Sequence, residues 1–385
     1  MNRGSVVSPN RWAVTLPVID LPTPYLVTDL GQVESRYAAF QAALPGVTTF
    51  YAMKCNPAPE ILQALAGRGA SFEIASLGEL RTLQAIGVDP ADVLYSNPVK
   101  PPAHIAAAHA DGLWRFSFDS PEELAKIAEQ APGSAVYVRL RVDDSTSVFP
   151  LSRKFGTDVE DAYDLMLLAR RLGLRPYGVT FHVGSQCTEA SAWGAAIGAA
   201  GELMTRLLAD GIELTMLDLG GGFPARYVED VPSIEEIGAV VRSALGLLPY
   251  RPELVAAEPG RYLVAEAAVL AATVIGRAER DGENWLFVEV GAYQGLMEVV
   301  QTPGGWRYPM WTTAEGPLVP FTVTGPTCDS SDTIGERVML PATITVGDVL
   351  HLGTTGAYTL SYASAFNGFP PPTPVFVGGA DPRAR

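Results

Sequence analysis

The sequence predicts an α/β fold in which an N-terminal (β/α)8 barrel, the TIM barrel architecture, is followed by an all-β domain. Eight strand-like runs alternate with amphipathic helical patterns over roughly 210 residues, which fits a barrel that typically takes about 250. After residue 264, β-rich pieces alternate with turns, as in a sandwich or small barrel. An open doubly wound sheet is the alternative, and it is less favoured because no strand leads directly into a G-x-G-x-x-G turn.

The expected domains are an N-terminal arm and strand over residues 1–30, the barrel over 31–263 and the β domain over 264–385. We expect the arm, with its apolar alternation in RWAVTLPVI, and the strand TPYLVTDL to pair with the β domain. The eight barrel runs are rich in β-branched and aromatic residues. They are TTFYAMK, SFEIAS, VLYSN, RFSFD, AVYVRLRV, YGVTFHV, LTMLDLG and LVAAE.

The intervening segments have helical periodicity, and several open with Pro or Glu and close with Gly, as helix ends do. Examples are PEILQALAGRG, GELRTLQAIG, PEELAKIAEQA and EASAWGAAIGAAGELMTRLLADG. Beyond residue 264 we expect almost no helix. The β-rich pieces there are VLAATVIGRA, NWLFVEVG, FTVTG, ERVMLP, DVLHLG and PVFVGG.

Composition excludes several classes of protein. The 385 residues carry a formal charge of −15, which makes nucleic acid an unfavourable partner and leaves cationic small molecules as plausible substrates. No uncharged run approaches the length of a membrane span, and the N-terminus has no apolar signal region, so we expect a cytoplasmic protein. The three cysteines lack metal-type spacing, and their odd number argues against a disulfide framework.

Lys54 stands where the first barrel run ends, in VTTFYAMKCNP. A lysine in a partly apolar pocket loses its proton readily and can attack a carbonyl to form a Schiff base, which is how enzymes tether pyridoxal phosphate. Taken alone, a lysine at this place is more often a strand-end lysine that reaches solvent. Active sites of barrels lie at the C-terminal ends of the strands. There the chain places Lys54, Glu73 and Ser76, Asn97, Asp119, Arg139 and Arg141, His182, Gly220 to Gly222, and Glu258.

Three further segments suit a phosphorylated pyridine cofactor. The glycines of DLGGGFP free backbone N–H groups to approach an anion, although such a run is more often only a tight turn. In EPGRY, Glu258 could keep a ring nitrogen protonated, and Arg261 could bind a phosphate group through two N–H groups of its guanidinium. HVGS offers His182, a flat imidazole that could stack on a ring or simply be a core histidine, and the hydroxyl of Ser185.

The β domain contributes GPTCDSSD and GAYT. Cys328 lies in a polar turn beside Asp329 and is a candidate reactive thiol, whereas Cys55 and Cys187 are expected to be small buried hydrophobes.

With these motifs the chain resembles the ornithine decarboxylase family, the fold-type III pyridoxal-phosphate decarboxylases that include diaminopimelate, arginine and lysine decarboxylases. The resemblance runs from TPYLVTDL to the FNGF at 366–369 and rests on YAMKCN, FHVGSQ, LGGGFP, EPGRY, GPTCDSSD and GAYT. It implies pyridoxal 5'-phosphate bound to Lys54, with Glu258 at the ring nitrogen and His182 against one ring face. The cofactor-binding residues that it implies are Lys54, Glu73, Arg139, His182, Ser185, Gly221, Gly222, Glu258, Gly260, Arg261 and Tyr358, of which Ser185, Gly222, Arg261 and Tyr358 would hold the phosphate.

The resemblance also implies a homodimer with shared active sites. Cys328 would protonate the carbanion left by carbon dioxide in the partner's site, and Asp329 would bind the distal amino group of a basic substrate. Eukaryotic ornithine decarboxylases carry a second acid near the substrate tail, where this chain has Thr302; Glu298 could take that place only if the loop runs differently. The substrate therefore stays open among ornithine, lysine, a diaminopimelate-like and a larger conjugated amino acid.

Three other functions compete. A racemase of the alanine racemase type shares the barrel-plus-β architecture but needs a second base, a tyrosine in that family, where this chain has a cysteine loop. A non-catalytic relative that binds a protein partner is disfavoured because Lys54 and Cys328 are both present. A single-domain barrel lyase using Lys54 without cofactor leaves the glycine loop, Arg261 and the β domain unexplained.

Overall fold

A computed structural model describes residues 21–302 and 304–379. The expected N-terminal arm, including RWAVTLPVI, lies outside these residues. The chain divides into two compact units. Of the described residues, we call 34–224 and 231–260 the barrel unit, and 21–33, 225–230, 261–302 and 304–379 the β unit.

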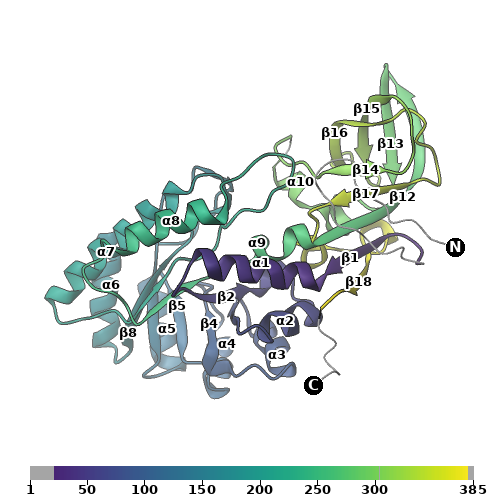
Figure 1. Cartoon of the computed structure of the whole chain (residues 1–385). Coiled ribbons are helices and arrows are strands. Elements are labelled where there is room, and N and C mark those ends of the chain that lie inside the picture. The colour runs from purple at the N-terminus through teal and green to yellow at the C-terminus, as the bar shows by residue number, and fades with distance from the viewer. Residues whose placement is uncertain (1–20, 303, 380–385) are drawn as a thin grey trace. The chain divides into compact units, whose positions relative to one another are not determined.

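The barrel unit is a closed ring of eight parallel strands in the order β10, β11, β2, β3, β4, β5, β6, β8. Figure 1 labels β2, β4, β5 and β8 of this ring. The predicted (β/α)8 barrel is confirmed, and the alternative of an open sheet is wrong. Each predicted run supplies one strand. The strands are β2 (Thr48–Ala52), β3 (Ser71–Ile74), β4 (Val93–Tyr95), β5 (Arg115–Phe118), β6 (Ala135–Leu140), β8 (Arg175–Phe181), β10 (Met216–Asp218) and β11 (Leu254–Ala257). A short antiparallel pair, β7 (Ser147–Phe149) and β9 (Ser185–Cys187), was not predicted.

Helices alternate with these strands, and polar caps start several of them. The side chains of Ser76, Ser120, Asp158 and Ser233 each accept a hydrogen bond from the free backbone N–H of a first turn. The helices are α1 (Leu30–Ala43), α2 (Pro59–Ala66), α3 (Leu77–Ala85), α4 (Pro102–Ala110), α5 (Pro121–Gln130), α6 (Val159–Arg171), α7 (Ser191–Ala209) and α8 (Ile234–Leu245). Among the described helices, none is long and apolar enough to span a bilayer.

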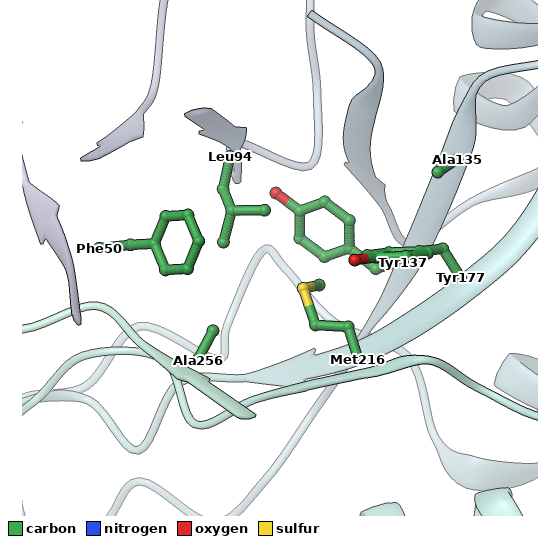
Figure 2. Close-up of a cluster of buried hydrophobic side chains, with 7 residues drawn as sticks. All are labelled: Phe50, Leu94, Ala135, Tyr137, Tyr177, Met216 and Ala256. Atoms are coloured by element: carbon green, nitrogen blue, oxygen red, sulfur yellow. The ribbon is translucent and has the colours of Figure 1, made fainter. Parts of the chain in front are cut away.

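The interior of the barrel is filled by side chains from several strands. Figure 2 shows Phe50, Leu94, Tyr137, Met216 and their neighbours converging from different strands of the ring. All are at most 8% exposed, so the barrel is a packed core and not a pore. This packing fixes the strand ends from which the polar residues of the site project.

The β unit is built on an eight-stranded sheet. Strand β1 pairs antiparallel with β12 and parallel with β18. The strands are β1 (Tyr25–Asp29), β12 (Ala268–Arg280), β13 (Glu283–Val288), β14 (Met310–Thr312), β15 (Leu318–Thr324), β16 (Thr333–Pro341), β17 (Val349–Gly353) and β18 (Thr373–Val377). The sequence pattern predicted most of them but missed β14. It also missed the short helices α9 (Arg261–Val264), η4 (Ala292–Leu296), α10 (Glu298–Gln301) and α11 (Thr359–Tyr362), because single turns are too short to show a helical period.

Candidate active site

Lys54 lies in a turn of 3-10 helix, η1 (Met53–Cys55), directly after β2. Its Nζ atom is 2.5 Å from Oε2 of Glu73, which projects from the neighbouring strand β3. Burial lowers the pKa of Lys54, but the carboxylates of Glu73 and Glu258 outweigh it, and the pKa is raised. These surroundings favour the protonated form of Lys54, whereas the sequence led us to expect an amine that loses its proton readily.

Glu258 follows β11, which pairs with β2 and so closes the ring next to Lys54. The carboxyl group is buried and accepts a hydrogen bond from Ser96 Oγ, which also lies 2.8 Å from the hydroxyl of Tyr137. Asp218, fully buried at the end of β10, is hydrogen-bonded to Glu258 and to Thr180. Burial and then the charge of Asp218 raise the pKa of Glu258 to about 8. The carboxyl groups of Glu258 and Asp218 are thus buried together, and the charge of Glu258 acts on Lys54.

These carboxyl groups predict how stability depends on pH. Burial raises the pKa of Glu73 to about 7, above the ordinary value of 4.5 that it regains on unfolding. Between these values the folded protein binds more protons than the unfolded chain, so the free energy of unfolding falls as pH rises, by up to about 1.4 kcal/mol per pH unit for each such group. We expect Glu73→Gln to flatten this decline in the cofactor-free protein between pH 5 and about 7, measured by urea unfolding. Glu160→Gln, at an exposed carboxylate, should leave it unchanged, and an unaltered slope in Glu73→Gln would contradict the assignment.

His182 follows β8, and its Nδ1 atom accepts a hydrogen bond of 3.0 Å from the N–H of Gly184. Burial and the charge of Arg139 hold the pKa of His182 well below its usual value. The imidazole is therefore neutral, with Nδ1 as the acceptor. A Cβ atom on Gly221 would lie only 3.0 Å from His182 Nε2, so glycine at 221 leaves room for the ring. The result is a flat, uncharged ring in a fixed orientation, as stacking requires.

The glycine loop packs too closely for other residues. Gly220 and Gly222 have φ angles of 60° and 98°, which favour glycine. A Cβ atom at Gly222 would lie 2.4 Å from the carbonyl oxygen of Gly184, and one at Gly260 would lie 2.9 Å from Cβ of Cys55. The chain therefore brings bare backbone to the rim beside His182 and beside the turn that carries Lys54. An amine, a buried acid, a flat imidazole and a glycine loop on one barrel rim fit a phosphorylated pyridine aldehyde.

Arg139, on β6, belongs to the same group of charges. Burial lowers its pKa, and the carboxylates of Glu258, Asp119 and Glu73 act on it from the surrounding strand ends. Arg141, two residues on, instead lines an open cavity of about 410 Å³ whose lining includes neither Lys54 nor Glu258. Of the residues predicted in the barrel unit, the structure thus brings together Lys54, Glu73, Arg139, His182, Gly221 and Glu258. Ser185 lies on β9, and its position across from Phe149 is fixed by the pairing with β7.

In the β unit, Arg261 begins α9 and is buried in an aromatic setting. Its guanidinium carbon lies 4.9, 5.1 and 5.7 Å from the ring centres of Tyr358, Trp306 and Tyr227. Two of its nitrogens bind the two carboxylate oxygens of Glu298, which is only 3% exposed. Glu298 is therefore committed to Arg261, and the interpretation that it could replace the missing substrate acid is wrong. Thr302, at the predicted place of that acid, donates to the carbonyl oxygen of Glu298 and ends α10.

The GPTCDSSD loop is held by its last residue. Asp332 is buried and accepts hydrogen bonds from Ala292 N–H at 2.7 Å and from the N–H and hydroxyl of Thr327. Cys328 is exposed, and its thiol lies 3.5 Å from Oδ1 of Asn367, in the FNGF segment. Cys55 and Cys187 are buried, as predicted. The loop thus presents one thiol and, beside it, the carboxylate of Asp329.

Several residues around these groups were not predicted. Asp218 opens the glycine motif and could have been suspected as a carboxylate that ends a buried strand. Ser96 and Tyr137 lie inside predicted strands and gave no signal, because a hydroxyl on a strand is usually structural. Asp332 could have been suspected only from its place as the last acid of GPTCDSSD.

Comparisons with known proteins by sequence and by structure agree on one family. A family model described as pyridoxal-dependent decarboxylase, pyridoxal binding domain, matches residues 30–265. The chain is 38% identical over 354 residues to lysine/ornithine decarboxylase of Selenomonas ruminantium, covering 91% of this chain and 88% of that protein. It is 36% identical to antizyme inhibitor 2 of Xenopus laevis, over 90% of this chain and 79% of that protein. A crystal structure of lysine/ornithine decarboxylase from Vibrio vulnificus complexed with cadaverine matches with a TM-score of 0.86 and 34% identity, covering 94% of this chain and 96% of that one.

Proposed function

Because the chain belongs to the family of pyridoxal-dependent decarboxylases, we propose that it removes the α-carboxyl group of an L-amino acid with a basic side chain, such as ornithine or lysine. It is an amino-acid decarboxylase, and pyridoxal 5'-phosphate is its cofactor. The basic substrate is supported by the similarity to enzymes named for lysine and ornithine. A diaminopimelate-like or larger conjugated amino acid is the alternative. The diamine formed from ornithine or lysine would place the reaction in polyamine metabolism.

The observation that carries the proposal is the position of Lys54 on the barrel rim, 2.5 Å from Glu73 and next to the strand that delivers Glu258. When bound, the cofactor supplies an aldehyde for the lysine amine and an electron-accepting ring for the electron pair left by carbon dioxide. Lys54 must lose its ammonium proton before it can bind the aldehyde, and Glu73 is placed to accept that proton. Glu258 would hold the ring nitrogen in its protonated form.

The remaining barrel residues would orient the cofactor. His182 would lie against one face of the ring, and its neutral state avoids a second positive charge beside Arg139. Ser185, Gly222, Arg261 and Tyr358 would bind the phosphate, with Gly221 and Gly260 providing close backbone approach. The positive φ angles of Gly220 and Gly222, which favour glycine and leave backbone N–H groups accessible to an anion, support this assignment.

Cys328 and Asp329 would act on the substrate. The exposed thiol of Cys328 would donate a proton to the α-carbon after carbon dioxide leaves, and Asp329 would bind the distal ammonium group. We propose that the protein is a homodimer in which both residues serve the partner subunit's site. A racemase is less well supported, because the loop offers a thiol where that class uses tyrosine. A purely binding role, as the name of the Xenopus relative suggests for that protein, is disfavoured by the retained Lys54 and Cys328.

The test is carbon dioxide release from a panel of amino acids by the purified protein supplied with pyridoxal 5'-phosphate. We expect release from lysine or ornithine at least about tenfold faster than from norleucine, because one charged hydrogen bond to Asp329 is worth about 1.5–3 kcal/mol. The Cys328→Ala variant should still bind cofactor but release the amine poorly. Release from no amino acid, or equal release from norleucine, would overturn the proposed function.

A further inference from the structure

The carboxylate of Asp329 is held at both oxygens by its own chain. Oδ1 accepts hydrogen bonds from the backbone N–H of Ser331 at 2.9 Å and from its hydroxyl at 2.6 Å. Oδ2 accepts a hydrogen bond of 2.6 Å from the hydroxyl of Tyr293. These bonds, those of Ser331 first, lower the pKa of Asp329 to about 2, so the group is an anion at any working pH. All three residues belong to the β unit.

Tyr293 is itself firmly placed. It lies in η4, a turn of π-helix, and its ring centre is 4.7 Å from that of Phe366. Its carbonyl oxygen accepts a hydrogen bond of 2.8 Å from the backbone N–H of Ser364. The neighbouring Ala292 N–H binds Asp332, the residue that anchors the other end of the same loop. The tyrosine hydroxyl therefore has a fixed direction relative to Asp329, independent of any substrate.

The number of acceptor positions still open on the carboxylate of Asp329 affects which cationic groups it can bind. A carboxylate has about four lone-pair positions, two on each oxygen. The two positions of Oδ1 are taken by Ser331 and one position of Oδ2 by Tyr293, so a single position on Oδ2 stays open. A primary ammonium group is a compact charge that can use one such position, whereas a guanidinium group binds best as a fork across two oxygens.

We propose that Tyr293 is a specificity-determining residue, which restricts Asp329 to one acceptor position and so selects substrates with a terminal primary ammonium group over those with a guanidinium group. This inference rests on the proposed function, in which Asp329 binds the substrate tail. It adds that the selection is made by a hydroxyl group that need not touch the substrate. The preset orientation also lowers the cost of fixing the carboxylate when the ammonium binds.

The experiment compares Tyr293→Phe, Ser331→Ala and the double variant with the wild type, all as cofactor-loaded protein. Tyr163→Phe is the matched control, because Tyr163 makes the same hydroxyl-to-aspartate bond, at 2.5 Å to Asp210, on the barrel unit. The probes are 1,5-diaminopentane, 1-aminopentane and agmatine, which carry a distal ammonium, no distal charge and a distal guanidinium. Their dissociation constants are measured by calorimetry, alongside kcat and KM for lysine, ornithine and arginine.

In Tyr293→Phe we expect 1,5-diaminopentane to bind about threefold to tenfold more weakly, because the carboxylate of Asp329 loses the hydrogen bond that presets its orientation, with 1-aminopentane unchanged. In the double variant each oxygen has an open position, so the preference for 1,5-diaminopentane over agmatine should fall by about tenfold or more. KM for lysine and ornithine should rise with little change in kcat. Tyr163→Phe should match the wild type.

Equal weakening of all three probes would show a merely structural role and overturn the inference, as would an unchanged preference in the double variant. The binding measurements do not depend on turnover. If the wild type decarboxylated none of the amino acids but the variants changed the probe preference as described, the proposed function would fail while the role of Tyr293 would be supported.

Discussion

Replacing Lys54 by alanine will abolish the visible absorption of the cofactor-loaded protein and lower decarboxylation by more than about a hundredfold. The reason is that the chain then lacks the amine that binds the aldehyde, and with it a group that moves a proton at that position. Lys54 is the lysine that lies beside Glu73 and next to the strand that delivers Glu258. The measurement is the absorption spectrum after addition of pyridoxal 5'-phosphate, together with carbon dioxide release.

The Lys54→Arg variant distinguishes the effect of losing the nucleophile from the effect of losing the positive charge. Arginine keeps a cation opposite Glu73 but stays protonated and cannot form the covalent bond. It should therefore be as inactive as Lys54→Ala, and an active, yellow Lys54→Arg protein would contradict the assignment. Mixing Lys54→Ala with Cys328→Ala subunits tests the proposed sharing of sites. If the sites are shared, a hybrid dimer would have one site with both residues intact, so activity should return. No recovery in proven hybrids would rule out sharing.

The fold was predictable because strand and helix patterns are local in sequence, and barrel geometry makes the ends of successive strands neighbours in space. Nearly every predicted strand carries a polar or glycine residue at or next to its end, and the strands are parallel, so these ends meet on one rim. Closure of the ring explains the least obvious pair: β2 and β11 are the first and last strands of the barrel in sequence, yet they pair directly. Lys54 and Glu258 are therefore neighbours despite the distance between them along the chain.

The partners of those residues were not predictable, because they depend on side-chain directions within the packed interior. Ser96 binds Glu258 from a different strand, and nothing in VLYSN distinguishes its hydroxyl from a solvent-facing one. The pair of Arg261 with Glu298 joins two short helices that have no sequence period. Lys54 shows the same limit: the strand pattern placed the amine, but its protonation state follows from the carboxylates around it.

A second large effect is expected at Lys100, in the loop between β4 and α4. Its side chain is fully buried, with Nζ 3.0 Å from Oε1 of Glu123 and 2.9 and 2.6 Å from the carbonyl oxygens of Asn97 and Ser117. Those carbonyls follow β4 and lie on β5, so one ammonium group ties two adjacent strand ends together. Burial lowers the pKa of Lys100 to about 8, and the carboxylate of Glu123 acts against this lowering.

Lys100→Met should lower the free energy of unfolding by roughly 3–5 kcal/mol, because it takes the donor from the carbonyls of Asn97 and Ser117 and a cation from the buried carboxylate of Glu123. Lys126→Met is the matched control. Lys126 binds the other oxygen of Glu123 at 2.5 Å, but its side chain is 29% exposed, so its loss should cost no more than about 1 kcal/mol. Urea unfolding at pH 7 measures both. If the two variants were equally stable, the buried lysine would not be the group that joins β4 to β5. The position of Ser96, the hydrogen-bond partner of Glu258, would then depend on packing alone.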